Sequence, residues 1–383
     1  MIRIERRLNQ PRWLSVAVPL GSLLFAFGVI AILLAATHAG SHYNPWYTYR
    51  RLFDAAFVAD GALSQTFVSA TPLLFTGLAA AAAFRMNLFN IGAEGQLYLG
   101  VVGGVGAALL LSGTPGPVEI AAMCVAGAAF GAVWALIPGV LRAFGRTNEI
   151  ITTLMLNYVA GLVINYLIFD THSYWRDTKS PSAAVFPQGQ AIPDRAFWPF
   201  ATLTDASGGV LVPLGIFVAT GIAFALWFLY RHTRFGFEVQ VIGDSPRAAQ
   251  YAGMRMRRKI LAVMALSGGI AGVGGAAQAG NFDHLLDPRG LQQSNYGYTG
   301  IVVAALARYN PFAVVLIAIL LGGLRNAGFA LQGTDFPSGL VGVMQGIFLF
   351  SVLGGELLVR YRVRIGRDRQ PIGAPASAPE AAQ

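Results

Sequence analysis

Residues 209 to 230 read GVLVPLGIFVATGIAFALWFLY, a run without a charged side chain. About 20 consecutive apolar residues are needed for a helix to cross the hydrocarbon layer of a bilayer, and this run is long enough. The whole chain has the same character, since 55% of its 383 residues are hydrophobic and only 12% are charged. Soluble domains carry about 25% charged residues, so the composition predicts a protein embedded in a membrane.

Further apolar runs on both sides of this segment predict an all-α bundle of ten transmembrane helices within residues 14 to 358. The run at 294 to 307 is short, and a re-entrant or broken segment is the alternative there. Such a segment is allowed in a bilayer only where protein or a water-filled cavity covers its backbone. The ten predicted spans are 14 to 36, 63 to 83, 96 to 112, 119 to 141, 149 to 170, 209 to 230, 260 to 279, 294 to 307, 311 to 331 and 337 to 358.

The basic residues predict which side each loop faces, because cytoplasmic loops carry an excess of Lys and Arg. With residues 1 to 13 in the cytoplasm, most of the 27 Lys and Arg residues fall on that side, many of them in the loop 231 to 259. The long loop 171 to 208, of mixed charge, then lies outside the cytoplasm. The chain returns to the cytoplasm at 359 to 383, where an Ala- and Pro-rich tail is predicted to be disordered.

Several other classes of function are not supported by the residues. The net charge of +9 is spread between apolar runs rather than gathered on one surface, so it does not indicate nucleic acid. The chain has no GxxxxGKS or GxxxxGKT loop for a nucleotide. The LSGGI segment at Leu266 to Ile270 lies in an apolar run, where Gly268 and Gly272 have the spacing of closely packed membrane helices. His38 and His42 flank a glycine in a predicted loop, so we expect no metal, cofactor or catalytic residue.

The loop segment RFGFEVQVIGDSPRAAQYAGMRMRRK, Arg234 to Lys259, predicts a short helix on the cytoplasmic side. Asp244 or Ser245 can cap a helix that starts at Pro246, whose fixed φ suits the first position. Gly253 is expected to end it. A short capped helix in a cytoplasmic loop is a surface that another protein can bind, although a simple surface turn is the alternative.

A second segment, MNLFNIGAEGQLYLG from Met86 to Gly100, combines polar side chains with glycines near a membrane boundary. Polar groups inside a membrane are costly and indicate function by default, and the glycines suit a broken helix that lines a cavity. The alternative is a cytoplasmic turn in which Glu94 caps the chain or pairs with Arg85. Both interpretations remain open at this point. The polar residues are Asn87, Asn90, Glu94 and Gln96.

Together the two segments resemble permeases of ATP-binding-cassette (ABC) importers of the branched-chain amino acid and simple-sugar type. The segment 86 to 100 resembles the nucleoside branch, whose members work with BMP-type binding lipoproteins, and the resemblance runs from Arg12 to about Arg360. It implies a multi-pass protein of the bacterial inner membrane. It also implies a second, non-identical permease, a cytoplasmic ATPase and an extracytoplasmic binding lipoprotein as partners, and a small-molecule substrate.

The resemblance also assigns residues. It implies a coupling helix that inserts into the ATPase, formed by Asp244, Ser245, Pro246, Arg247, Ala248, Ala249, Tyr251, Ala252 and Gly253. It implies that the segment from Asn87 to Gln96 lies beside the translocation pathway. Aromatic and amide side chains at or within spans suit a nucleoside: Phe89, Tyr98, Asn157, Tyr158 and Asn165. Sugars use the same types, so the nucleoside preference comes from the resemblance alone. The candidate pathway residues are Asn87, Phe89, Asn90, Glu94, Gln96 and Asn157.

The sequence leaves three alternatives for function: an importer of the same type for simple sugars or another small polar solute, an ion-coupled carrier and a membrane enzyme. A carrier is expected to have acidic residues in mid-membrane, and an enzyme needs a polar catalytic cluster; neither is evident.

Arg325, inside the predicted span 311 to 331, either extends to the outer membrane surface or faces a polar cavity.

Overall fold

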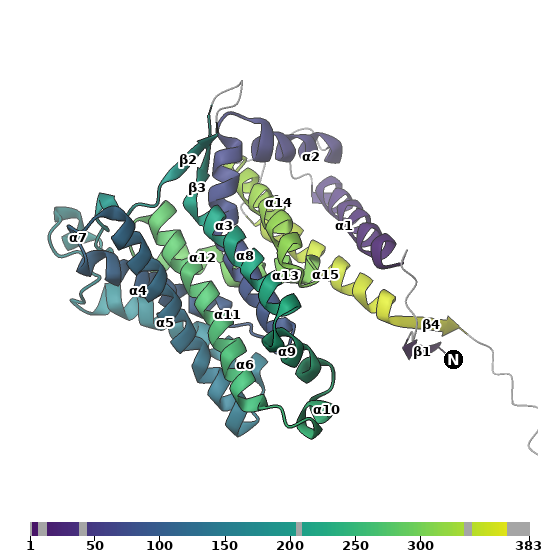
Figure 1. The fold of residues 1–383 in the computed structure, drawn as a ribbon. Coiled ribbons are helices and arrows are strands. Elements are labelled where there is room, and N and C mark those ends of the chain that lie inside the picture. Colours follow the sequence, from purple (N-terminus) through teal and green to yellow (C-terminus); the bar gives the residue numbers. More distant parts are fainter. Residues whose placement is uncertain (1, 7–13, 38–43, 204–208, 333–338, 366–383) are drawn as a thin grey trace, which may run out of the picture.

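The computed structural model describes residues 2–6, 14–37, 44–203, 209–332 and 339–365. These residues are mostly helical (Figure 1), which confirms the all-α prediction. Helices α2, α6 and α11 continue into π-helical turns at Asp54–Val58, Tyr166–Asp170 and Ala279–Asp283. The helices are α1 (Leu14–Thr37), α2 (Pro45–Phe53), α3 (Ala62–Phe84), α4 (Ala93–Leu110), α5 (Gly116–Gly145), α6 (Glu149–Asn165), α7 (Pro181–Val185), α8 (Leu214–His232), α9 (Arg234–Asp244), α10 (Pro246–Tyr251), α11 (Met256–Gln278), α12 (Pro288–Ser294), α13 (Tyr296–Leu306), α14 (Pro311–Ala330) and α15 (Leu340–Arg360).

A helix covers most of each predicted span. Among the described residues, seven helices, counted with their π-helical turns, have the length and apolar composition needed to cross a membrane: α3, α4, α5, α6, α8, α11 and α14. The predicted span that starts at residue 209 begins later, at Leu214, because Val210–Pro213 forms a strand. The total of ten crossings and the cytoplasmic location of both ends stay predictions.

Small residues bring the central helices together. Helix α11 packs against α5, α4 and α3. At Gly272 of α11 an added Cβ would overlap the carbonyl oxygen of Gly127 on α5, and at Gly268 it would overlap the carbonyl of Gly131. Backbones in such close contact pack without the space that larger side chains need, as expected for association inside lipid. The predicted packing role of Gly268 and Gly272 is confirmed.

The predicted short span is one part of a broken helix. Helices α12 and α13 are separated by Asn295, which has a left-handed backbone with φ of 51°. The Thr76 hydroxyl of α3 donates to the carbonyl of Tyr296 at 3.0 Å. Thr76 lies eight residues, about 12 Å of helix rise, before the end of α3 at Phe84, so the break is deep in the bundle. The broken-segment alternative is therefore correct.

Two short antiparallel strand pairs lie outside the helices. Strand β2 (Phe200–Leu203) pairs with β3 (Val210–Pro213), and β1 (Ile2–Arg6) pairs with β4 (Tyr361–Ile365). The two ends of the described chain are therefore side by side. The predicted disordered tail is corrected for its first residues, since α15 reaches Arg360 and β4 follows it. The rest of that tail lies outside the described residues.

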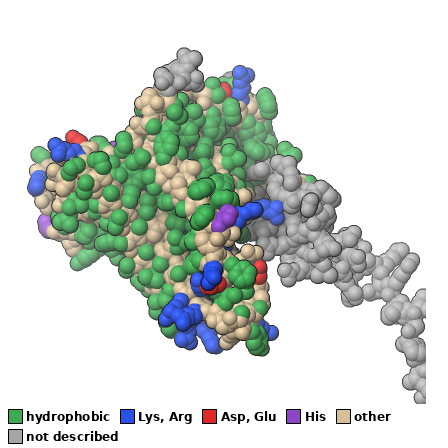
Figure 2. All heavy atoms as spheres, viewed as in Figure 1, with side chains coloured by type: hydrophobic (Ala, Val, Ile, Leu, Met, Phe, Trp, Pro, Cys, Tyr) green, Lys and Arg blue, Asp and Glu red, His purple; other side chains and the backbone are tan. Residues whose placement is uncertain are grey.

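Most charged side chains lie at the lower end and at the left and upper margins of the visible face, with a further group at mid-height beside the grey atoms, and hydrophobic side chains cover much of the surface between them (Figure 2). Helices α7 and α10 lie at opposite ends of the bundle (Figure 1). This distribution is the one expected for a protein whose middle contacts lipid. It also separates the loop that contains α7 from the loop that contains α10.

Candidate translocation site and coupling surface

The segment between α3 and α4 enters the bundle instead of forming a turn at its surface. It begins at Asn87, which has a left-handed φ of 54° and donates from Nδ2 to the carbonyl of Gly243 in α9 at 2.7 Å. It then follows the first two turns of α6, a rise of about 12 Å. Its contacts with α6 are, in order, Phe89 N to Glu149 Oε1 at 3.5 Å, Ile91 N to Thr153 Oγ1 at 3.2 Å and Asn157 Nδ2 to Ile91 O at 2.9 Å.

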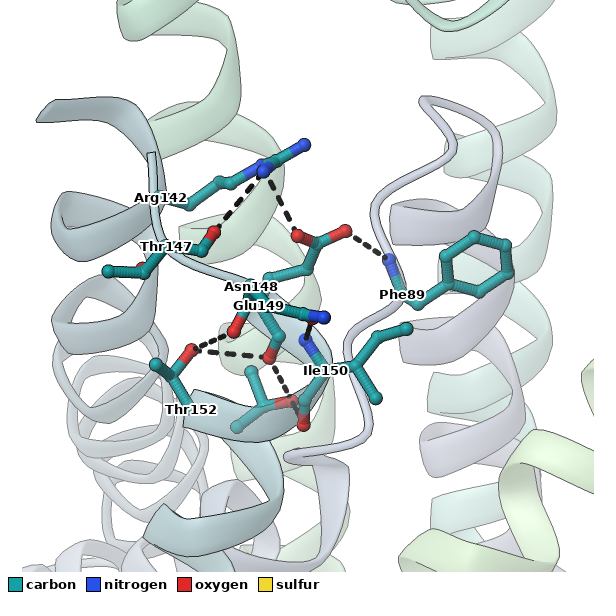
Figure 3. Close-up of polar contacts among 8 residues, drawn as sticks. Phe89, Arg142, Thr147, Asn148, Glu149, Ile150 and Thr152 are labelled. Atoms are coloured by element: carbon teal, nitrogen blue, oxygen red, sulfur yellow. Dashed lines mark hydrogen bonds and ion pairs between the residues drawn. The ribbon is translucent and has the colours of Figure 1, made fainter. Parts of the chain in front are cut away.

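An ion pair fixes the start of this path, and it was missed from the sequence. Arg142 Nε at the end of α5 lies 3.2 Å from Glu149 Oε2, and the Glu149 side chain is 8% exposed. Figure 3 shows the two side chains facing each other, with the ring of Phe89 turned away from them. Arg142 also donates to the carbonyl of Thr147 at 3.2 Å. The pair therefore joins α5, α6 and the segment that leads to α4.

Asn90 and Gln96 are buried and satisfy each other. Asn90 Nδ2 donates to Gln96 Oε1 and Gln96 Nε2 donates to Asn90 Oδ1, both at 2.9 Å. Asn90 also donates to the Ser267 hydroxyl at 2.8 Å, and that hydroxyl donates to the carbonyl of Ala79 at 2.7 Å. These bonds join α3, α4 and α11 around the irregular backbone. Both amide side chains lie inside the helical bundle rather than on its surface.

Glu94 lies where the amino ends of two helices meet. Its carboxylate, in the first turn of α4, is 1% exposed. It accepts hydrogen bonds from the Tyr98 hydroxyl at 2.7 Å, from Tyr298 N at 3.3 Å and from Gly297 N. The last two amides start α13, directly after the break. A negative charge is stabilised at helix amino ends, so Glu94 both caps α13 and compensates the unpaired amides of the broken backbone.

The predicted alternative in which Glu94 pairs with Arg85 is wrong. Arg85 donates to the carbonyl of Tyr309 at 3.4 Å, and its guanidinium lies 5.3 Å from the ring centre of Tyr230. Arg85 is at the end of α3, whereas the chain after it carries Glu94 into the bundle. The sequence separation of nine residues was therefore misleading, because an extended segment covers more distance than a turn.

Arg325 faces the break and not the outer membrane surface. Its Nη1 donates to the carbonyl of Ser294 at 2.5 Å, and its guanidinium lies 4.4 Å from the ring centre of Tyr296. The polar-cavity alternative is thus closer to the structure than the surface alternative. The Glu94 carboxylate accepts from the amides that directly follow the break. The break therefore contains one group of each charge.

The two remaining pathway candidates differ in exposure. Asn157 is 4% exposed, accepts from Gly95 N at 2.9 Å and donates to the Tyr298 hydroxyl at 3.3 Å. It ties α6 to the first turns of α4 and α13. The side chain of Phe89 is 40% exposed, and its ring centre lies 5.2 Å from the ring centre of Phe84.

The predicted short helix in the cytoplasmic loop is present as α10. Ser245, and not Asp244, caps it by accepting from Ala248 N at 3.4 Å, and Pro246 is its first residue. Gly253 follows with a left-handed φ of 70°. Ala249 is the one buried residue among the predicted set, and the others are exposed: Asp244, Ser245, Pro246, Arg247, Ala248, Tyr251, Ala252 and Gly253.

Two basic clefts flank α10. One has a volume of about 820 Å³ and includes Glu238 and Lys259, whose side chains form an ion pair at 2.6 Å between α9 and α11. The other, of about 810 Å³, includes Arg142 and Arg146 from the end of α5. Because α10 is exposed between them, it presents a ridge with a hollow on each side.

The chain is similar to known permeases over most of its length. Residues 62–353 match the family described as "Branched-chain amino acid transport system / permease component". The chain is 33% identical to the glucose ABC transporter permease protein TsgB13 of Haloferax volcanii, over 98% of this chain and 97% of the relative. It is 31% identical to the guanosine ABC transporter permease protein NupP of Bacillus subtilis, over 88% and 92%. It is 29% identical to the nucleoside ABC transporter permease protein NupB of Lactococcus lactis subsp. cremoris, over 88% and 90%.

Proposed function

The chain belongs to the family of permease components of branched-chain amino acid transport systems, and we propose that it takes up purine nucleosides as one of two non-identical permeases in an ABC importer. As a family member it is a multi-pass cell-membrane protein and a transport subunit, not an enzyme. The nucleoside preference is supported by NupP and NupB, each aligned over 88% of this chain. The resemblance of the segment 86 to 100 to nucleoside permeases points the same way.

The contact that carries the proposal is the hydrogen bond from Asn87 Nδ2 to Gly243 O, 2.7 Å long. It joins the end of α9, directly before α10, to the segment that leads to Glu94 and the break in α12–α13. A force applied to α10 by an ATPase is therefore passed to the middle of the membrane. The energy comes from ATP bound to the ATPase partner, since this chain has no nucleotide-binding loop of its own.

In this mechanism α10 inserts between the lobes of the ATPase, and closure of the ATPase moves α9 and α10 together. The Glu238–Lys259 ion pair transmits the same motion to α11. The bundle then alternates between two arrangements, and a substrate delivered by an extracytoplasmic binding lipoprotein passes through. Such a two-state element, biased by a partner, is the general requirement for coupling between distant sites.

Uptake of labelled guanosine tests both the coupling surface and the substrate. Tyr251 of α10 is 93% exposed, and Tyr251→Glu places a charge on the proposed ATPase contact without disturbing the bundle. We expect uptake to fall at least tenfold, which corresponds to a loss of about 1.4 kcal/mol. A loss of this size is expected at an interface residue that contributes strongly to binding. Tyr174→Glu, at a tyrosine that is 50% exposed in the loop 171 to 208, is the matched control and should leave coupling intact. Equal uptake by the Tyr251→Glu variant and the parent would remove α10 from the mechanism.

Sugar import is the second candidate, and one observation favours it: TsgB13 aligns over more of the chain than the nucleoside permeases do. Competition separates the two. Excess unlabelled guanosine should abolish uptake of labelled guanosine, and excess glucose should not. Transport of glucose without transport of guanosine would replace the nucleoside assignment and leave the ABC importer assignment unchanged.

A further inference from the structure

Four uncharged polar residues lie where α6 meets the broken helix. We call this surface the amide–tyrosine patch; it consists of Tyr158, Asn165, Gln292 and Tyr298. Gln292 Nε2 donates to Asn165 Oδ1 at 3.0 Å. Tyr158 is 64% exposed and follows Asn157, whose Nδ2 donates to the Tyr298 hydroxyl at 3.3 Å.

The patch lies at membrane depth. Tyr158 and Asn165 are within α6, one of the helices apolar enough to cross the bilayer. Gln292 precedes the break at Asn295, and Tyr298 follows it. Polar side chains that face lipid are costly, and a broken backbone in a membrane is tolerated where it lines a cavity. Both arguments require that something other than lipid covers this surface.

The backbone next to the patch has no positive end to offer an anion. Broken membrane helices often direct a free amino end toward anionic substrate groups. Here Gly297 N and Tyr298 N, at the start of α13, both donate to the Glu94 carboxylate. The guanidinium of Arg325 is held by the Ser294 carbonyl and lies over the ring of Tyr296. The site therefore selects for a neutral solute.

We propose that the amide–tyrosine patch contacts the substrate in the translocation pathway and takes a neutral nucleoside. The inference rests on the proposed function, and it adds the residues that touch the solute. The exposed ring of Tyr158 supplies a face on which a nucleobase stacks. The amides of Gln292 and Asn165, about two turns along α6 from Tyr158, supply donors and acceptors for the base edge or the ribose hydroxyls.

Transport rates test the contact. Tyr158→Leu removes the stacking face, and we expect the maximal rate of guanosine uptake to fall about tenfold, the value of one base–aromatic stack. The half-saturating guanosine concentration stays unchanged, because the binding lipoprotein sets it. Tyr158→Phe keeps the face and should recover most of the rate. A rate for Tyr158→Leu equal to that of the parent, at equal membrane levels, would overturn the proposal.

Cysteine labelling tests the same surface without relying on transport rate. Cys124 is the single cysteine of the chain, so a Cys124→Ser parent permits single-cysteine variants. In membranes that contain the assembled transporter, Gln292→Cys should react with a water-soluble thiol reagent, and guanosine should slow the reaction. Phe224→Cys, at a ring that is 57% exposed on α8, is the lipid-facing control and should not react. An unreactive Gln292→Cys would overturn the proposal.

The outcomes separate the site from the function. If guanosine uptake is intact but guanosine does not protect Gln292→Cys from the thiol reagent, the proposal that the patch contacts the substrate is wrong, and the importer assignment stands. If glucose protects Gln292→Cys and guanosine does not, the patch lines the pathway, and the proposals of a nucleoside substrate for both site and importer are overturned.

Discussion

Two sets of polar residues lie within a few turns of each other in this bundle, and they differ in where their hydrogen bonds go. Asn90, Glu94 and Gln96 are at most 1% exposed, and their polar atoms bond to other groups of the chain. Tyr158 on α6 and Gln292 on α12 are exposed. The difference shows that polar side chains in a membrane protein have two roles. A buried side chain with all its hydrogen bonds made holds irregular backbone in place, and an exposed side chain is available to bind a solute.

The largest effect is expected when the buried set is broken. Glu94→Leu leaves Gly297 N and Tyr298 N without their acceptor, and the Tyr98 hydroxyl keeps only the carbonyl of Leu291 at 3.4 Å. Each unsatisfied buried group costs about 1–3 kcal/mol, so we expect a loss of about 3 kcal/mol in stability and a low yield of folded protein. Glu94→Gln retains an acceptor oxygen and should lose less. Thermal unfolding in detergent measures both, and a Glu94→Leu variant as stable as the parent would contradict the capping role.

A second way to disturb the buried region is to separate its helices. Gly272→Leu forces a side chain into the carbonyl of Gly127, so α11 and α5 must move apart. Overpacking of this kind costs about 1–3 kcal/mol. Gly221→Leu on α8 is a matched control, because an added Cβ there meets nothing within 4 Å. The thermal midpoint should fall for Gly272→Leu alone; equal midpoints would show that the close contact contributes little.

A smaller loss of stability is expected from a substitution at the start of the segment between α3 and α4. Arg142→Leu removes the partner of Glu149, whose side chain is 8% exposed while that of Arg142 is 38% exposed. Because one partner is screened by solvent, we expect the Arg142→Leu variant to lose about 1 kcal/mol of stability. The double variant Arg142→Leu, Glu149→Gln should recover part of the stability, since no unpaired charge remains. Failure of the second substitution to recover stability would show that the two residues act separately.

The smallest effect on stability is expected in the amide–tyrosine patch. Gln292→Leu removes an exposed amide and should change the thermal midpoint little, because substitutions at exposed positions are usually within about 0.5 kcal/mol. Guanosine uptake should nevertheless fall. Gln293→Leu, at the adjacent exposed residue, controls for changes in the local helix. A Gln292→Leu variant that loses stability and uptake together would place Gln292 with the buried set.

Local features were predicted well from the sequence. Helix α10 was found because Ser245, Pro246 and Gly253 act on their immediate neighbours, and such signals need no tertiary structure. The apolar runs were found for the same reason. The number of crossings does not follow in the same way, because length and composition alone do not determine whether a helix crosses the bilayer.

The broken helix was only half predicted. Its first part, α12, has the polar sequence PRGLQQS and fails a test based on hydropathy. A signal was present, because Asp287 caps α12 by accepting from Arg289 N at 3.1 Å and Pro288 occupies the first position. The backbone partners of Glu94, Gly297 N and Tyr298 N, were beyond prediction. They lie more than 200 residues away in the sequence, so only the folded bundle brings them together.

ATP-driven uptake in proteoliposomes tests the central claim most directly, with this permease reconstituted beside its partner permease, ATPase and binding lipoprotein. The account predicts accumulation of labelled guanosine that requires ATP and is blocked by unlabelled guanosine but not by glucose. Accumulation of glucose alone, or guanosine uptake that continues without ATP, would contradict it.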